Sequence, residues 1–137
     1  MNFPMKAIAI RTAKEKIMAR VLIIEDSVFQ RTILKRIVQQ SGHEAVEAAS
    51  GREALRKIDE LQPDLIFLDL LMPDINGFQV LQVLDSKFVK TPVVVVTADV
   101  QETTRQKCQE HGVVELVNKP VNDEKMFEVI NKHLGSR

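Results

Sequence analysis

Short apolar runs alternate with segments of helical periodicity along this chain. The runs predict strands near residues 20–25, 44–48, 64–68, 93–97 and 113–117. Apolar residues three or four positions apart predict helices near 27–40, 51–61, 100–111 and 122–134, with one more helix directly after a loop at 69–77. The first helix has an apolar stripe made of Phe29, Ile33, Leu34, Ile37 and Val38.

The alternation of strands and helices predicts an α/β fold. The runs at 21–24, 65–68 and 93–96 are wholly apolar, which is typical of parallel strands with helices on both faces. Because the crossovers between parallel strands are right-handed, such a sheet must be doubly wound. The helix at 100–111 differs from the others, since only Val100 and Cys108 in it are clearly apolar. We expect it to be weakly anchored to the core.

Length and composition are those of one ordinary globular domain, with 137 residues, 45% of them hydrophobic. The 19 basic and 19 acidic residues cancel, and no run approaches the roughly 20 apolar residues of a membrane span. We therefore expect a cytoplasmic protein that binds neither nucleic acid nor membrane. Residues 1–19 are basic and are expected to form an extension, disordered or helical, before a domain at 20–137. The single cysteine excludes an internal disulfide and a cysteine metal cluster.

Polar residues follow the predicted strands where each strand ends. Glu25 and Asp26 follow the first strand, Asp69 follows the third, Thr97 closes the fourth, and Lys119 comes shortly after the fifth. The carboxyl ends of parallel strands meet at one edge of the sheet, where ligands bind in open α/β folds. If these strands are neighbours, one crevice collects three carboxylates, a hydroxyl and an ammonium group.

This combination of groups indicates phosphoryl transfer. Three carboxylates at close range raise one another's pKa and destabilise the fold unless a cation compensates them. Mg²⁺ suits the position, since it binds through one or two carboxylates and takes further oxygens from a phosphoryl group. Lys119 can pair with Asp69 or with a phosphoryl oxygen, and Thr97 supplies a hydroxyl donor. Asp69, before a loop, is the candidate acceptor in the manner of aspartyl-phosphate intermediates.

The chain resembles the receiver domain of response regulators in two-component systems, and most of all the stand-alone receivers typified by chemotaxis regulators. The matching motifs, spread over residues 20–134, are Glu25-Asp26-Ser27, the segment from Asp69 to Gly77, Thr97-Ala98 and Lys119-Pro120. The resemblance implies a flavodoxin-like (βα)5 fold with a five-stranded parallel sheet in the order 2-1-3-4-5. It also implies a phosphoacceptor signalling protein rather than an enzyme.

The resemblance further implies roles for the site residues. Asp69 would accept a phosphoryl group from a sensor histidine kinase or a phosphotransfer protein. Mg²⁺ would be bound by Asp26, Asp69 and the main-chain carbonyl of Leu71, with Glu25 acting through water. The peptide bond between Lys119 and the following proline is expected to be cis. The output would be a change in contacts with a downstream protein target over residues 100–134.

Three departures from the family pattern stand out. Glu25 replaces the commoner aspartate, which leaves the ionised group in place. Leu71 is apolar where many relatives carry a polar residue near the hydrolytic water, and Asp99 follows Thr97 at two positions, so we expect slow autodephosphorylation. Leu116 stands where the family usually has Tyr or Phe. Switching is therefore expected to run through Thr97, Lys119 and the helix at 100–111.

Three other functions share some of these features. A haloacid-dehalogenase-like phosphatase needs a second aspartate two positions after the first, where Leu71 stands. A nucleotide-binding flavodoxin-like protein needs a phosphate loop rich in glycine, serine or threonine, and none of the five glycines forms one. A receiver-fold interaction module that works without phosphorylation stays open, because Leu116 favours it and the intact set of Asp26, Asp69, Thr97 and Lys119 opposes it.

Overall fold

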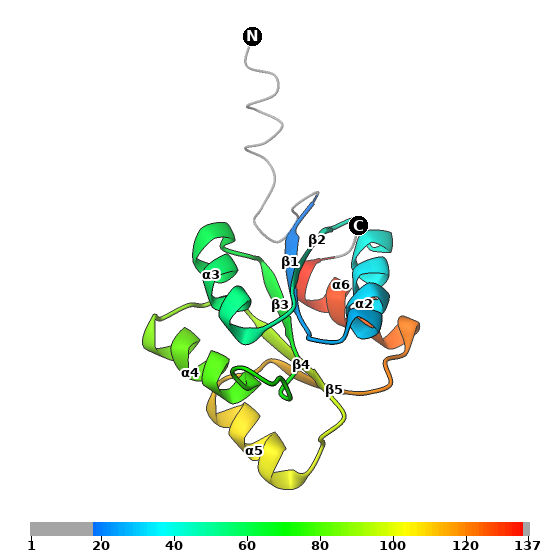
Figure 1. The fold of residues 1–137 in the computed structure, drawn as a ribbon. Coiled ribbons are helices and arrows are strands. Elements are labelled where there is room, and N and C mark those ends of the chain that lie inside the picture. Colours follow the sequence, from blue (N-terminus) through cyan, green and yellow to red (C-terminus); the bar gives the residue numbers. More distant parts are fainter. Residues whose placement is uncertain (1–17, 136–137) are drawn as a thin grey trace.

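The computed structural model describes residues 18–135, and Figure 1 shows the fold. Five parallel strands form one sheet in the order β2-β1-β3-β4-β5, which confirms the predicted fold class and strand order. The strands are β1 (Arg20–Ile24), β2 (Glu44–Ala48), β3 (Leu65–Leu68), β4 (Val93–Thr97) and β5 (Glu115–Asn118). The helices are α2 (Val28–Gln40), α3 (Gly51–Leu61), α4 (Gly77–Ser86), α5 (Glu102–Glu110) and α6 (Asp123–Leu134).

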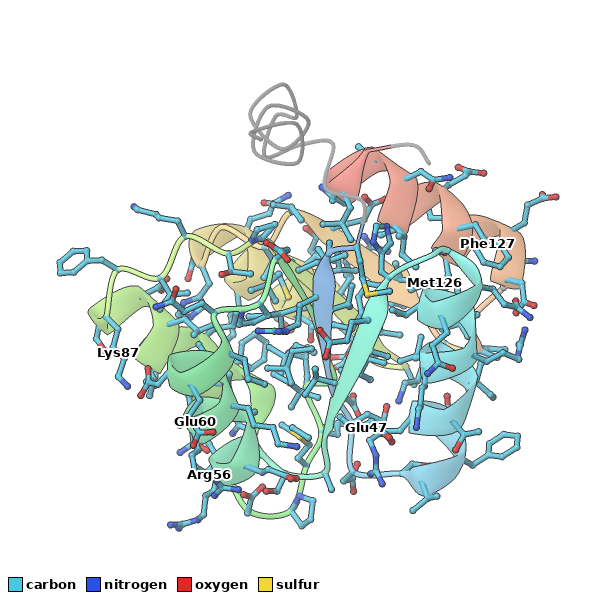
Figure 2. All side chains as sticks on the ribbon, turned by 90° about the horizontal axis from the view of Figure 1, so that it is seen from above. Glu47, Arg56, Glu60, Lys87, Met126 and Phe127 are labelled. Carbon is cyan, nitrogen blue, oxygen red and sulfur yellow. The ribbon has the colours of Figure 1, made fainter. Side chains whose placement is uncertain are left out.

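Helices cover both faces of the sheet, with α2 and α6 on one face and α3, α4 and α5 on the other (Figure 1). Successive residues of the central strands point to opposite faces, so β1 contributes to two apolar clusters. Val21 and Ile23 pack in the cluster with α2 and α6, and Leu22 and Ile24 pack in the cluster with α3 and α4. Figure 2 shows Met126 and Phe127 on α6, where Met126 is fully buried.

Helix starts follow the local chemistry of the sequence. The Ser27 hydroxyl accepts from the Gln30 backbone N–H and begins α2 directly after the acid pair. At α4, Asn76 and Gln79 accept from each other's backbone N–H, which makes a capping box. Both caps hold loops at the carboxyl edge of the sheet. In α5 only Thr104 and Cys108 are buried, which confirms the weak anchor expected for this helix.

One apolar residue of α2 is exposed. Phe29 belongs to the apolar stripe expected for α2, but its side chain is 69% exposed. Phe29 lies in the first turn of α2, whereas the buried residues of this helix begin at Leu34. The extension was predicted at residues 1–19. Residues 1–17 lie outside the described residues, and Ala19 packs in the core. No helix in the described part of the chain is long and apolar enough to cross a bilayer.

Gly77 allows the loop after β3 to pack tightly under the site. A Cβ atom at this position would lie 2.7 Å from the Leu70 Cα and 2.8 Å from the Asp69 carbonyl oxygen. The contact atoms belong to the backbone that carries Asp69, so they cannot move aside without moving that residue. The close approach therefore positions the carboxylate.

We predict that Gly77→Ala lowers the free energy of unfolding by about 2 kcal/mol, as expected for overpacking. Chemical denaturation measures the change, and Gln82→Ala, an exposed position of the same helix, is the control. An equal effect of the two substitutions would contradict the close packing.

Candidate functional site

The carboxylates lie together because the main-chain pairing continues past the strand ends. The Glu25 N–H donates to the Ala48 carbonyl oxygen at 3.1 Å, and the Asp69 N–H donates to the Ile24 carbonyl oxygen at 3.0 Å. The residues that follow β1 and β3 are thereby held side by side. Oxygens of Glu25, Asp26 and Asp69 lie within 4.8 Å of one another. The predicted gathering of three carboxylates is present.

Lys119 reaches the same place from the end of β5. Its N–H donates to the Thr97 carbonyl oxygen at 2.9 Å, and the peptide bond to Pro120 is cis, as expected. The Nζ atom lies 2.6 Å from Glu25 Oε1 and 3.4 Å from Asp69 Oδ2. The pairing with Asp69 was anticipated from the sequence. The closer pairing with Glu25 was not, because the sequence does not show which acid the lysine side chain meets first.

Burial strengthens the interactions between these charged groups. Glu25 is 2% exposed, and burial together with the neighbouring charge of Asp69 raises the pKa of its carboxyl above the ordinary value, against the hydrogen bond from Lys119. Burial opposes the positive charge of Lys119, but the hydrogen bond to Glu25 and the charge of Asp69 raise the pKa of its ammonium group. One cation is thus shared by two buried acids, with Asp26 exposed beside them.

Side chains of the loop after β3 are alternately buried and exposed, and the buried ones hold the loop that carries Asp69. Leu70 and Met72 are buried in the cluster under α3 and α4, while Leu71 between them is 64% exposed. The Leu71 N–H donates to Asp69 Oδ1 at 3.3 Å. Asp69 itself is 6% exposed. One carboxylate oxygen is therefore held by the backbone of its own loop, and the other faces Lys119.

Thr97 ends β4, which lies between β3 and β5 in the sheet, and is fully buried. Its Oγ1 accepts from the Asp99 N–H at 3.3 Å, which leaves the hydroxyl proton available for donation. The Asp99 carboxylate accepts from the Gln101 N–H at 3.2 Å and from the buried Thr104 hydroxyl at 2.8 Å. Asp99 therefore connects the site to the first turn of α5. The role of Thr104 was not predicted from the sequence, although a threonine five residues after an aspartate at a helix start could have indicated this hydrogen bond.

The donor set fits a hard divalent cation. Among the described residues, Glu25, Asp26 and Asp69 form the one cluster of at least three potential metal ligands. All of the oxygens belong to carboxylates, which suits Mg²⁺ better than the softer metals that prefer nitrogen or sulfur. The single ammonium group of Lys119 does not balance the three acids. A bound cation would supply the missing positive charge.

Comparison with known proteins shows the family of this chain. Residues 21–131 match the model of the response regulator receiver domain. The chain belongs to the response regulator receiver family. This receiver is 32% identical over 120 residues to Protein PilH of Pseudomonas aeruginosa, covering 86% of this chain and 99% of PilH. It is 33% identical to Chemotaxis protein CheY of Listeria monocytogenes, over 84% of this chain and 98% of that protein.

Solved receiver structures show the same fold. Chemotaxis protein CheY4 of Vibrio cholerae superposes with a TM-score of 0.79 at 30% identity, covering 85% of this chain and 99% of that one. The response regulator domain of Thermotoga maritima CheB gives 0.77 at 28% identity, with 88% and 98% covered. The similar relatives PilH and CheY are matched over nearly their whole length, so this receiver resembles the stand-alone members of the family.

We predict that Lys119→Met lowers the free energy of unfolding by about 3 kcal/mol in Mg²⁺-free buffer, because two buried acids lose their shared cation. Denaturant titration at neutral pH measures the loss. Lys132→Met is the matched control, since Lys132 also contacts an acid but its side chain is 67% exposed. That substitution is expected to cost less than about 1 kcal/mol. Similar losses in both variants would contradict the central role of Lys119.

Proposed function

We propose that this chain is a cytoplasmic single-domain response regulator whose Asp69 accepts a phosphoryl group from a sensor histidine kinase or a phosphotransfer protein. The reaction depends on Mg²⁺, and the output is a change in protein–protein contacts. The observation that carries the proposal is the buried Asp69 carboxylate beside the Lys119 ammonium, with Glu25 and Asp26 adjacent. A structural ion pair has no need of the additional acids, whereas phosphoryl transfer uses them to hold a cation.

Each residue has a role in the proposed transfer. Asp26, Asp69 and the main-chain carbonyl of Leu71 would hold Mg²⁺, with Glu25 acting through water. When bound, the ion neutralises negative charge on the phosphoryl oxygens. An Asp69 carboxylate oxygen forms a bond to phosphorus while the bond from phosphorus to the donor imidazole nitrogen breaks, and the imidazole leaves with its electron pair. Lys119 then pairs with a phosphoryl oxygen.

Thr97 is suited to donate a hydrogen bond to the phosphoryl group. Its oxygen already accepts from the Asp99 N–H, so the hydroxyl proton points elsewhere. When the Thr97 hydroxyl donates to a phosphoryl oxygen on Asp69, its hydrogen bond with the Asp99 N–H changes. The Asp99 carboxylate in turn accepts from the Thr104 hydroxyl in α5. This path does not need an aromatic residue on β5, where Leu116 is only partly buried.

Two surfaces support the proposed partners. Val28 and Phe29 are 68% and 69% exposed directly after the acid pair, and Leu71 is exposed after Asp69, so an apolar rim is available to a phosphodonor protein. On the output side, a hollow of about 240 Å³ between α5 and β5 includes Val114, which is 44% exposed. The downstream target is proposed to bind over residues 100–134.

The experiment that tests the proposal is intact-mass analysis after incubation with a small phosphodonor, with and without Mg²⁺. We predict a single phosphoryl adduct in wild type that requires Mg²⁺ and is absent from Asp69→Asn. Asp123→Asn changes an exposed aspartate at the start of α6 and is expected to keep the adduct. Absence of an adduct on folded wild type that binds Mg²⁺ would instead favour the interaction module that works without phosphorylation.

A second prediction concerns the lifetime of the phosphoryl group. The exposed Leu71 side chain offers no hydrogen bond to a hydrolytic water, so we expect slow autodephosphorylation. Leu71→Asn supplies an amide at the same place and is predicted to shorten the lifetime, measured by the decay of the mass adduct. An unchanged lifetime would show that the side chain at 71 does not control access of water.

A further inference from the structure

The first turn of α3 binds a carboxylate from the loop that carries Asp69. Asp74 Oδ1 accepts from the Gly51 N–H at 3.1 Å, and Asp74 Oδ2 accepts from the Arg52 N–H at 3.1 Å. Both N–H groups belong to the set that a helix cannot pair internally at its start. Asp74 follows these partners by 23 and 22 positions in the chain, so it caps a helix to which it does not belong.

This helix also has a cap of its own. The Ser50 hydroxyl accepts from the Glu53 N–H at 3.1 Å, and the Ser50 carbonyl oxygen accepts from the Ala54 N–H at 3.0 Å. Ser50 is therefore sufficient to begin α3 in the ordinary way. The two bonds to Asp74 come in addition to this cap, and their further consequence is to join the loop after β3 to the start of α3.

The loop and the helix approach each other to backbone contact, and Gly51 makes this possible (Figure 1). A Cβ atom on Gly51 would lie 2.8 Å from the Ile75 Cβ atom and 2.9 Å from the Ile75 carbonyl oxygen. Ile75 is partly buried and packs against the apolar cluster under α3 and α4. The loop therefore contacts α3 through an apolar side chain and, one residue earlier, through the Asp74 carboxylate.

The charge of Asp74 suits its position. The partial positive charge at the start of a helix favours a carboxylate. Loss of hydration raises the pKa of the Asp74 carboxyl, but hydrogen bonds from the N–H groups of Arg52, Ile75 and Gly51 lower this pKa below its ordinary value. Both oxygens are thus available as acceptors near neutral pH. An asparagine amide has one acceptor oxygen and would turn donors toward the other N–H group, so it cannot replace the carboxylate.

The start of α3 is also connected to the other acids of the site. It follows β2, and the Ala48 carbonyl oxygen at the end of β2 accepts from the Glu25 N–H at 3.1 Å. Asp74 therefore links the segment after β3, which carries Asp69, to the segment after β2, which supports Glu25. A fixed distance between these two segments keeps the acids of the cluster in register.

We propose that Asp74 is a positioning residue: its carboxylate, bound to the start of α3, holds the loop after β3 and so keeps the Asp69 carboxylate and the Leu71 carbonyl in place for a cation. Asp74 acts through the loop, since it is not part of the cluster of potential metal ligands. The hold on the loop is a property of the cation-free protein, whereas its effect on cation binding rests on the proposed function.

Amide hydrogen exchange, measured by NMR on the full chain in Mg²⁺-free buffer, tests the hold on the loop. Asp74→Asn is expected to speed exchange at Gly51 and Arg52, which lose their acceptor. It is also expected to speed exchange by at least about fivefold at Gly77, whose N–H donates to the Leu70 carbonyl oxygen inside the loop. A wild-type rate at Gly77 in this variant would overturn the proposal, because Asp74 would then only cap α3.

Ser50→Ala is the matched control, since it removes the other cap from the same helix end. We expect faster exchange at Glu53 in this variant, because its N–H loses the serine hydroxyl, and a rate near that of wild type at Gly77. An equal increase at Gly77 in both variants would overturn the specific role of Asp74, since any weakening of α3 would then release the loop.

Calorimetric titration of Mg²⁺ into the same proteins tests the effect on the site. Asp74→Asn is expected to lower the affinity for Mg²⁺ by about tenfold, as for residues that orient metal ligands, and Ser50→Ala to leave it near the wild-type value. Equal affinity of wild type and Asp74→Asn would overturn the positioning role. A wild type that binds no Mg²⁺ would instead contradict the proposed function, and the exchange rate at Gly77 would still decide whether Asp74 holds the loop.

Discussion

The site depends on one ammonium group shared by two buried carboxylates. Lys119 lies between Glu25 and Asp69, and each of the three comes from the end of a different strand. The fold brings these three side chains together. The strand order places β1 beside β3, so the acids that follow these strands meet at one edge of the sheet. The tight loop around Gly77 completes the position of Asp69.

This arrangement is electrostatically incomplete. Three acids face one lysine, and burial raises the pKa of Glu25. Proteins tolerate such clusters where a ligand supplies the missing charge, and the oxygen-only donor set selects a hard cation. Because Asp26 is exposed while its two neighbours are buried, the cluster is open on one side, where a cation and a phosphoryl group can approach.

The positions of the strands and helices were predictable because hydrophobic periodicity is a local pattern, whereas the strand order came from the resemblance to receiver domains. Periodicity fixes the elements, and the strand ends fix which polar residues meet. Contacts between side chains from distant segments were not predictable, such as the preference of Lys119 for Glu25 and the bond from Thr104 to Asp99. Periodicity grouped Phe29 with the apolar stripe of α2, but it does not show which turns of a helix are covered.

The claim that a cation supplies the charge missing from this cluster is tested most directly by calorimetric titration of Mg²⁺ into wild type and Asp26→Asn. Asp26 is the informative position, because it is exposed and takes no part in the Lys119 pairing, so its substitution removes a charge without disturbing the buried acids. The account predicts one Mg²⁺ site in wild type and a loss of affinity of at least about tenfold in the variant. Equal affinity of the two proteins, or no binding to wild type, would contradict it.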